Sequence, residues 1–554
     1  MNIINRAMRL LYQNEWVLLS IILVCALALR IHVLHLPGPN ADELLDAFQA
    51  ERLRLGDPLW IPTFRIAAYS LPAGFNGYQG AFPIYVHWLI SKFTDQPLRF
   101  RYINVLYDLG SICFLYLFTR TFISKRAALL IAAFQATMPS PVFFSRIGAM
   151  VTYMRIMFAS AVLFCFYRWS TRRDWGAFYF GCLVLGLGIS TRLEIIWWPI
   201  AATAYFILLD RSRLKEELSA FWTHKRKALV GAACFLVGSS LFIAFNVVTH
   251  GGTFSEITQN LVRTDVGHTN LEFLKNLGER VKHLVELLDG SSIWGMSLAY
   301  KNILFSVTFG LAFLTTLIVA LVARLRGQVE RRIEFLAFML VFMLLESTFS
   351  LSTLKAMHLL ILLPVPLLIL VKFLDMIPWK SLVALTAAAL VAGNIWVDIR
   401  YYDSLRRFPG QGGYSTRIYS FVEELQRAGV SRVIACDWGL ARHVYYFSKG
   451  RIKVKEIWGD SHNFPASFYL ELELAAAFQE PSTSFLFFAS PWSTGERERA
   501  FLDYLRERGL TYDQRVFYDD YGPIYLVYQV PRQNRPVDRV ADSGRAAGLL
   551  AGLR

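Results

Sequence analysis

The sequence predicts a multi-pass α-helical membrane protein with a C-terminal extracytoplasmic α/β domain. Of its 554 residues, 55% are hydrophobic and only 18% are charged. Long apolar runs recur along residues 1–399, and after residue 399 the pattern changes to the shorter helix and strand periods of a soluble domain. Because soluble domains are about one quarter charged, this composition excludes a single water-soluble globule and a disordered chain.

About eleven segments are apolar enough to cross a bilayer as helices. They cover residues 16–35, 102–118, 127–144, 149–167, 177–190, 195–209, 228–248, 303–322, 333–351, 357–373 and 381–398. The fifth and sixth segments are short, and the polar residues Ser190, Thr191, Arg192 and Glu194 separate them. We therefore expect a helical transmembrane domain over residues 1–399.

The basic residues give the predicted orientation. When the spans alternate through a membrane, most Lys and Arg residues of the loops collect on one side, which the positive-inside rule makes the cytoplasm. These residues are Arg6, Arg9, Arg120, Lys125, Arg126, Arg168, Arg172, Arg173, Arg211, Arg213, Lys215, Lys225, Arg226, Lys227, Arg324, Arg326, Arg331, Arg332, Lys372 and Lys380. The N-terminus is thus predicted to be cytoplasmic and the region after residue 399 extracytoplasmic. The net charge of +15 is largely this topology signal, so no nucleic-acid partner is expected.

Two long extracytoplasmic loops follow from this threading. The first, 37–101, contains the apolar segment 81–93, which is too short to span a bilayer and is expected to be interfacial. The second, 249–301, contains one predicted helix near 271–288. Loops of this length are usually functional or disordered, so the second loop is either a plain surface loop or a cover over a site.

Residues 400–532 are predicted to form the α/β domain, and residues 533–554 a flexible tail. The predicted elements are a helix over 415–428, strands over 432–437 and 484–489, a helix over 496–508, and a hairpin of 515–519 with 524–530. We expect Asp437 and His443 to stabilise this domain rather than to catalyse a reaction.

An acidic pair, Asp42 and Glu43, follows directly after the first predicted span. In one interpretation the pair is structural: Asn40 caps the next helix, Glu43 completes a capping box three residues later, and Asp42 complements the helix dipole. In the other interpretation it is functional, because a carboxylate held at the outer membrane surface near apolar walls is well placed as a general base.

Isolated cations recur at the same predicted membrane face. Arg146 ends the third span and Arg192 lies between the fifth and sixth, while Lys355 and His358 share one face where the tenth begins. Charges near bilayer depth are costly, which makes them candidates for function. Snorkelling, or an ion pair such as Arg192 with Glu194, is the structural alternative for each. Together the cations predict a site for an anionic headgroup, most simply a phosphate.

The order of these features resembles the GT-C superfamily of polyprenyl-phosphate-sugar glycosyltransferases, in particular the protein O-mannosyltransferase and lipid A aminoarabinose transferase group. The residues that carry the resemblance are Asp42 and Glu43, a Gly-rich approach to Pro83 and Tyr85, Arg99 and Arg101, Pro139 and Pro141 followed by Ser145 and Arg146, and Lys355 and His358 followed by 359–364. The resemblance covers about the first 370 residues and is strongest over 37–150, although no single motif is as specific as a Walker loop.

The resemblance implies a GT-C fold and an inverting hexosyl- or pentosyltransferase. Such an enzyme moves one sugar from a polyprenyl-phosphate donor to an acceptor hydroxyl outside the membrane. By the same resemblance Asp42 is the catalytic carboxylate and Glu43 assists it. Asp42 would draw the proton from the attacking hydroxyl while the cations bind the departing lipid phosphate. The acceptor is left open between a protein, lipopolysaccharide and another envelope glycan. Because the chain has no N-x-S/T sequon, a bacterial inner membrane is the simpler expectation.

One departure from the family concerns metals. Many of these glycosyltransferases carry a second acidic residue at the outer start of the fourth span, where this chain has residues 148–153 without a carboxylate. No DxD-type cluster replaces it, so a divalent metal stays open as a cofactor but the sequence does not support one. Two other classes stay open: a transporter or flippase of lipid-linked glycans, and a non-catalytic membrane scaffold. The chain lacks the paired half-sequences typical of transporters, which favours the enzyme.

Overall fold

The computed structural model describes residues 14–148, 152–264, 267–293, 295–296, 298–328, 330–351, 355–457, 483–493 and 495–530. The chain divides into two compact units. The helical unit takes Met1–Pro37 and Leu45–Gly410, and the α/β unit takes Gly38–Leu44 and Gln411–Arg554. The acidic pair therefore belongs to the α/β unit, although it follows the first predicted span in sequence. The predicted tail, 533–554, lies outside the described residues.

The helical unit is built from long helices joined by short elements. The longer helices are α2 (Glu15–Ile31), α5 (Arg99–Phe122), α6 (Lys125–Thr137), α8 (Thr152–Arg172), α9 (Trp175–Ile189), α10 (Trp197–Leu208), α12 (Lys225–Gly238), α15 (Phe273–Asp289), α16 (Ile303–Leu325), α17 (Arg331–Glu346), α18 (Pro364–Met376) and α19 (Lys380–Arg407). The connecting elements are α3 (Leu45–Leu55), β1 (Thr63–Ile66), β2 (Tyr69–Pro72), β3 (Gly74–Asn76), β4 (Gln79–Gly80), α4 (Phe82–Ile90), α7 (Pro139–Ile147), η2 (Leu193–Ile196), α11 (Arg211–Thr223), α13 (Ser240–Val248), α14 (Gly252–Gln259) and η3 (Ala356–Leu362).

Each of the eleven predicted segments is helical over most of its described length. By length and apolar composition, three helices in the described part are able to cross a membrane: α5, α16 and α19. The number rises to as many as seven if each of four bent helix pairs counts as one span. The mostly helical membrane architecture is thus confirmed, while the count of about eleven spans stays a prediction.

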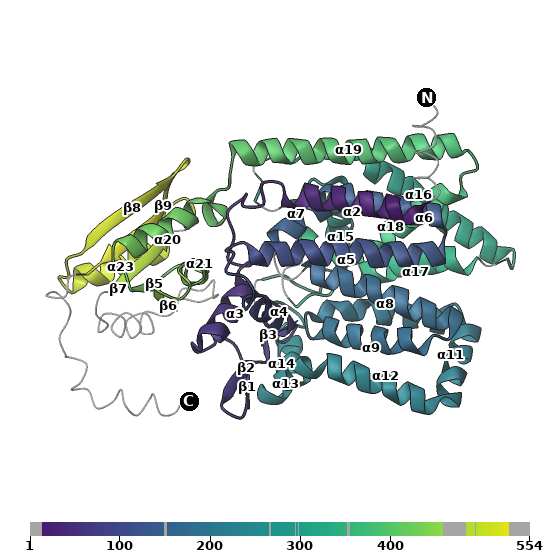
Figure 1. Cartoon of the computed structure of the whole chain (residues 1–554), viewed down its shortest axis with the longest axis horizontal. Helices are drawn as coiled ribbons and strands as arrows, with labels where there is room; N and C mark the ends of the chain where they lie inside the picture. Colours follow the sequence, from purple (N-terminus) through teal and green to yellow (C-terminus); the bar gives the residue numbers. More distant parts are fainter. Residues whose placement is uncertain are drawn as a thin grey trace. The chain divides into compact units, whose positions relative to one another are not determined.

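The long helices run side by side, and the connecting elements gather at their ends. Four of them form one layer, in which α5 contacts α8, α8 contacts α9, and α9 contacts α12 (Figure 1). Helices α3, α4 and α14 lie at one end of this layer, and α11 lies at the other (Figure 1). Helices α3 and α4, which fall within the predicted loop 37–101, and the basic helix α11 are thus at opposite ends of this layer (Figure 1).

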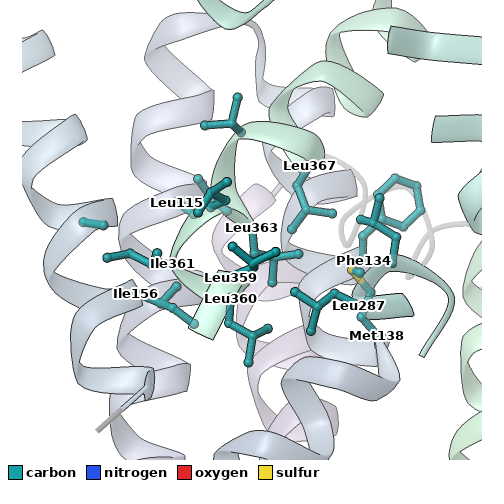
Figure 2. Close-up of a cluster of buried hydrophobic side chains, with 14 of the residues drawn as sticks. Leu115, Phe134, Met138, Ile156, Leu287, Leu359, Leu360, Ile361, Leu363 and Leu367 are labelled. Atoms are coloured by element: carbon teal, nitrogen blue, oxygen red, sulfur yellow. The ribbon is translucent and has the colours of Figure 1, made fainter. Parts of the chain in front are cut away.

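The core of the helical unit surrounds a short, fully apolar break between η3 and α18. Leu359, Leu360 and Ile361 of η3 lie against Leu115 of α5 and Ile156 of α8 (Figure 2). Every residue from 356 to 371 is buried. Pro364 begins α18 because proline is tolerated in the first turn of a helix but not in its interior. This packing fixes the chain that carries His358.

A buried ion pair links three helices of the unit. Arg30 of α2 forms a salt bridge with Asp108 of α5, and both side chains are inaccessible to solvent. Arg30 also donates to the carbonyl oxygen of Ala136, at 2.9 Å, and Gln135 donates to Asp108 at 3.1 Å. A buried pair is tolerated only when its remaining hydrogen-bonding groups are satisfied, and α6 supplies these partners.

The α/β unit forms, within its described residues, a five-stranded sheet in the order β6-β5-β7-β9-β8. Its elements are η4 (Gly412–Tyr414), α20 (Arg417–Arg427), β5 (Arg432–Ala435), α21 (Leu440–Phe447), β6 (Lys453–Glu456), β7 (Thr483–Phe488), α23 (Glu496–Glu507), β8 (Asp513–Asp519) and β9 (Gly522–Gln529). Strand β5 pairs in parallel with β6 and β7, whereas β9 pairs antiparallel with β7 and β8.

The burial pattern of this unit explains the order of its strands. Strand β7 is buried at five of six positions, as expected for a central strand covered on both faces. Strand β6 alternates between exposed and half-buried residues at the edge. Helix α20 buries Ile418, Phe421, Val422 and Leu425, the spacing of one helix face. Asp437 accepts a hydrogen bond from Phe488 N at 2.8 Å, which ties the end of β5 to β7 and gives Asp437 a stabilising role.

We predict that Asp108→Ala destabilises the helical unit by about 3 to 5 kcal/mol, because it leaves the buried Arg30 guanidinium without its carboxylate. Denaturant unfolding of the purified protein in detergent measures this loss. The control is Asp403→Ala, which removes an exposed i,i+3 pair with Arg406 and is expected to cost under about 0.5 kcal/mol. A loss below 1 kcal/mol for Asp108→Ala would show that the pair does not stabilise the fold.

Candidate functional site

The acidic segment, Gly38–Leu44, forms a turn held by its own side chains. The Asn40 backbone N–H donates to Glu43 Oε1 at 3.2 Å, and the Asp42 N–H donates to Asn40 Oδ1 at 2.6 Å. These are the bonds of the predicted capping interpretation, although helix α3 begins only at Leu45. Glu43 is 4% exposed, whereas Asp42 is half-buried. Glu43 thus organises the turn, and Asp42 is the more accessible carboxylate of the pair.

In the helical unit, three of the four predicted phosphate ligands come together. His358 lies within electrostatic range of Arg192 and Lys355, and also of Arg155 and Arg280. We call these five residues the cation cluster. Four of them are buried, and Lys355 is exposed. The cluster joins residues of α8, α15, the α9–η2 junction and η3, which are far apart in sequence.

His358 is held in one orientation by the backbone next to it. The Lys355 backbone N–H donates to His358 Nδ1 at 2.9 Å. Because Nδ1 accepts this bond, the ring proton of the neutral imidazole lies on Nε2, which makes Nε2 the donor nitrogen of the ring. A neutral histidine oriented in this way is able to donate a hydrogen bond to an anion without adding a further positive charge.

Arg192 is positioned by a short strand-like pairing. Residues 78–82 run antiparallel to residues 190–193, with Gly80 N bonded to Thr191 O at 3.0 Å and Leu193 N bonded to Tyr78 O at 2.8 Å. The two backbones approach so closely that a Cβ on Gly80 would lie 2.0 Å from Ser190 O. Only glycine fits there, which accounts for the Gly-rich approach in the sequence.

One nitrogen of the Arg192 guanidinium pairs with a carboxylate, and another has no hydrogen-bond partner among the described residues. Its Nε lies 2.8 Å from Glu194 Oε1, the ion pair considered from the sequence, and Arg155 lies 3.4 Å from the other carboxylate oxygen. One carboxylate thus serves two guanidinium groups. Within the described part of the chain, Arg192 Nη1 is buried and has no hydrogen-bond partner. A buried donor without a partner is costly, so Arg192 Nη1 is a candidate contact for an anionic ligand.

Arg146 has a different setting from the cation cluster. Its Nη2 donates to the carbonyl oxygens of Val33 at 2.7 Å and Leu36 at 3.2 Å, and its guanidinium lies over the Tyr402 ring at 5.0 Å. The side chain therefore anchors the end of the first predicted span. Its Nε and Nη1 atoms are buried and lack hydrogen-bond partners among the described residues. Two of its donors are thus still available for an anion.

Three residues of this region were not predicted from the sequence. Arg155 could have been identified from the sequence, because a charged residue within the predicted span 149–167 is a candidate for function. Arg280 gives no such signal on the amphipathic helix α15, where its Nε donates to Ser347 O at 3.0 Å. Asp46 sits on α3 directly after the acidic pair and looks like a surface residue in sequence, yet it is 5% exposed.

Asp46 is a buried carboxylate that senses the charge of Arg192. Burial raises its pKa from 3.8 to about 7, and the Arg192 charge opposes this rise. Among the described residues, its Oδ1 has no hydrogen-bond partner. The side chain is thus poised between its neutral and ionised forms near neutral pH.

An apolar cavity of about 300 Å³ opens beside Glu194. It is lined by Tyr78, Leu193, Glu194, Ile196, Trp197, Ile200, Ile257, Glu346, Phe349, Ser350 and Leu351. The cavity lies between the start of α10 and the end of α17, so it shares Glu194 with the cation cluster. An anion-binding cluster next to an apolar cavity suits a ligand with a charged head and a hydrocarbon body.

Metal ligands are not grouped in the described part of the chain. Within those ranges, no set of three or more His, Cys, Asp or Glu side chains is placed to hold a metal ion. The charged groups that do come together are cations, and these suit an anionic ligand.

Comparisons with known proteins agree with this arrangement. Residues 81–244 match the family model of dolichyl-phosphate-mannose-protein mannosyltransferase. The fold matches ArnT from Cupriavidus metallidurans in the apo state with a TM-score of 0.58 and 12% identity, over 94% of this chain and 98% of that chain. ArnT bound to undecaprenyl phosphate gives a TM-score of 0.57 and 12% identity, over 93% and 97%. The apo oligosaccharyltransferase of Archaeoglobus fulgidus gives 0.51 and 12%, over 95% and 75%. No curated protein sequence matches the chain.

These matches support the resemblance to the GT-C superfamily: the family-model match covers residues 81–244, and the solved structures share the fold. The matched segment 81–244 contains Arg146, Arg155 and Arg192, and it excludes the acidic pair and the Lys355–His358 segment. The roles of the individual site residues therefore rest on geometry and chemistry.

We predict a pH dependence of stability from Asp46. Its folded-state pKa of about 7 exceeds the ordinary 3.8, so the folded protein binds the extra proton between these values and loses stability as pH rises through them. Between pH 5 and pH 8, the free energy of unfolding of the wild-type protein should fall by roughly 2 to 3 kcal/mol relative to that of Asp46→Asn. Unfolding in detergent across this range measures the difference. Parallel stability curves for the two proteins would contradict the buried, protonated state of Asp46.

Proposed function

We propose that the protein is an inverting glycosyltransferase that moves a single sugar from a polyprenyl-phosphate donor to an acceptor hydroxyl. The observation that supports this most strongly is the cation cluster, in which Arg155 and Arg192 share one carboxylate and Arg192 keeps an unfilled donor. ArnT, which has the same fold, is known in complex with undecaprenyl phosphate. A lipid phosphate has the charge and the oxygen acceptors that the cluster requires.

The proposed donor site combines three kinds of cation contact. Arg192 offers a planar guanidinium for a forked bond to phosphate oxygens, and Lys355 offers an exposed point charge. His358 would donate from Nε2. We also propose Arg146 as a phosphate ligand through Nε and Nη1, while its Nη2 stays on the backbone. As the bond to the sugar breaks, negative charge builds on the phosphate, and preorganised donors stabilise that charge.

The hydrocarbon part of the donor would occupy the apolar cavity beside Glu194. Trp197, Ile200 and Phe349 supply its apolar walls. The cavity of about 300 Å³ takes the first isoprene units only, so the rest of the chain would extend into lipid. A shared wall residue, Glu194, connects this cavity with the arginines that would hold the phosphate.

Asp42 is proposed as the general base. It would take the proton of the acceptor hydroxyl while that oxygen attacks the anomeric carbon, and the sugar–phosphate bond breaks on the opposite face, which inverts the centre. Glu43 is the assisting residue, because its carboxylate fixes the turn through the Asn40 backbone N–H. The acceptor class stays open between a protein, lipopolysaccharide and another envelope glycan.

We further propose that the reaction takes place on the extracytoplasmic face of a bacterial inner membrane. The positive-inside pattern supports a cytoplasmic N-terminus, and it puts the acidic pair and the α/β unit outside. The arrangement of α11 and α3 at opposite ends of the helices supports the same threading (Figure 1). A lipid-linked donor is consistent with that location, because soluble nucleotide sugars are absent there.

The base assignment is tested by Asp42→Asn. This variant should insert and fold normally but transfer sugar at least about 100-fold more slowly, the usual contribution of a general base. Transfer from a labelled polyprenyl-phosphate sugar in proteoliposomes measures it. The matched control is Asp520→Asn, which changes an exposed carboxylate of the same unit and should leave transfer unaltered. Near-normal transfer by Asp42→Asn would refute the assignment.

The donor site is tested by Lys355→Ala and Arg192→Ala. Each variant should raise the donor KM about tenfold or more while leaving the acceptor KM nearly unchanged, because a hydrogen bond to a charged group contributes about 1.5 to 3 kcal/mol. Arg326→Ala, which removes an exposed arginine at the predicted cytoplasmic side, is the control. If the donor KM is unaltered in both variants, the cations serve the fold and not the donor.

A further inference from the structure

The α/β unit encloses the acidic segment by contacts from two of its elements. His443 of α21 is 3% exposed, and its two ring nitrogens face backbone oxygens on either side. Nε2 lies 2.8 Å from Pro39 O, and Nδ1 lies 2.9 Å from Gly439 O. A neutral imidazole carries one ring proton, so the ring donates to one of these two oxygens, and it lies between the start of α21 and the residue three positions before Asp42.

The backbone of the segment touches the α/β unit at two glycines. Gly439 has φ +83°, and a Cβ at this position would lie 2.2 Å from the Ala41 Cβ. A Cβ on Gly38 would lie 2.3 Å from Ser415 O. Neither position admits a larger residue without displacing its neighbour. The segment is therefore fixed on both sides of Asn40.

Buried apolar residues also hold the acidic segment in place. Ala41 is 5% exposed and Leu44 is fully buried, so the residues that flank the acidic pair face inward. Within the turn, the N–H groups of Asp42 and Glu43 are bonded to Asn40 at 2.6 and 3.1 Å. With both ends of the turn held and its amides bonded, the direction of the Asp42 side chain is restricted to the rotamers that this backbone allows.

We propose that the α/β unit is a positioning device for the acidic segment, with His443 as the positioning residue that fixes Pro39 and thereby aims the Asp42 carboxylate. This inference rests on the proposed role of Asp42 as the base. Small displacements of a catalytic group are enough to slow a reaction about 100-fold, so residues of the same unit that touch no reacting atom can still control the rate.

The test compares His443→Leu with His443→Gln and Val444→Ala. Leucine removes both polar contacts. Glutamine keeps an N–H donor at about the reach of Nε2. Val444 is a fully buried neighbour on α21, and its truncation weakens the same domain core without removing the contact to Pro39. We expect His443→Leu to lower kcat about 10- to 100-fold with both KM values nearly unchanged. His443→Gln should restore most of kcat, and Val444→Ala should keep it.

Hydrogen exchange supplies a readout that is independent of activity. In His443→Leu, the amides of Asp42 and Glu43 should exchange at least about tenfold faster, while those of β5, β7 and β9 keep their wild-type rates. In Val444→Ala, the Asp42 and Glu43 amides should stay protected. Unchanged exchange at these two amides in His443→Leu would overturn the proposal, and so would faster exchange with an unaltered kcat.

The two proposals fail separately in this design. If Asp42→Asn transfers sugar normally, the base assignment is wrong, whatever His443→Leu does. If Asp42→Asn is inactive and His443→Leu keeps its kcat, Asp42 is the base and the positioning role is wrong. If His443→Leu does not fold, the comparison of His443→Gln with Gly439→Ala decides: the glutamine variant should retain kcat, and Gly439→Ala should lose it, because its Cβ would displace Ala41.

Discussion

The cost of burying guanidinium groups constrains the helical unit more than any other interaction. Arg30, Arg101, Arg146, Arg155, Arg192 and Arg280 are among its largest fully buried side chains. A buried charge has to be paired or hydrogen-bonded, because its desolvation costs several kcal/mol. The unit meets this requirement in two ways. Arg30 has a carboxylate of its own, and Arg101 donates to the carbonyl oxygens of Leu34 and Pro37 at 2.6 and 2.8 Å. Arg155 and Arg192 instead share Glu194.

This difference separates guanidinium groups whose donors the protein satisfies from those that keep an unfilled donor. A guanidinium of the first kind fixes the fold, as Arg30 does between α2 and α5. One of the second kind, such as Arg192, would gain from a bound anion, and this is the basis of the proposed donor site. Arg146 combines both roles, with one nitrogen on the backbone and two donors without partners among the described residues. The buried segment η3 then matters because it carries His358, and Lys355 next to it, to within electrostatic range of the same arginines.

The sequence predicted the helical membrane architecture and the α/β elements, because these depend on local periodicity. It also indicated that Arg192, Lys355 and His358 lie close together, because charge in lipid is costly, while their role as phosphate ligands stays a prediction. It also predicted the capping bond of Glu43 and the Arg192–Glu194 pair, since both are short-range. It did not predict the burial of Asp46, because the packing of α3 against α4 buries this helix and the local sequence pattern does not indicate it. Nor did it predict the contact of His443 with Pro39, because 404 positions of chain separate the two residues.

If the cation cluster binds the phosphate of a lipid carrier, the protein has to distinguish a phosphorylated lipid from the corresponding alcohol. Native mass spectrometry of the detergent-solubilised protein tests it directly by competition between a polyprenyl phosphate and the polyprenol of equal chain length. We predict that the phosphate binds at least about tenfold more tightly than the polyprenol, and that Arg192→Ala removes this preference while leaving the weak binding of polyprenol. Equal binding of the two lipids by the wild-type protein would contradict phosphate binding by the cluster, because it would assign the affinity to the apolar cavity alone.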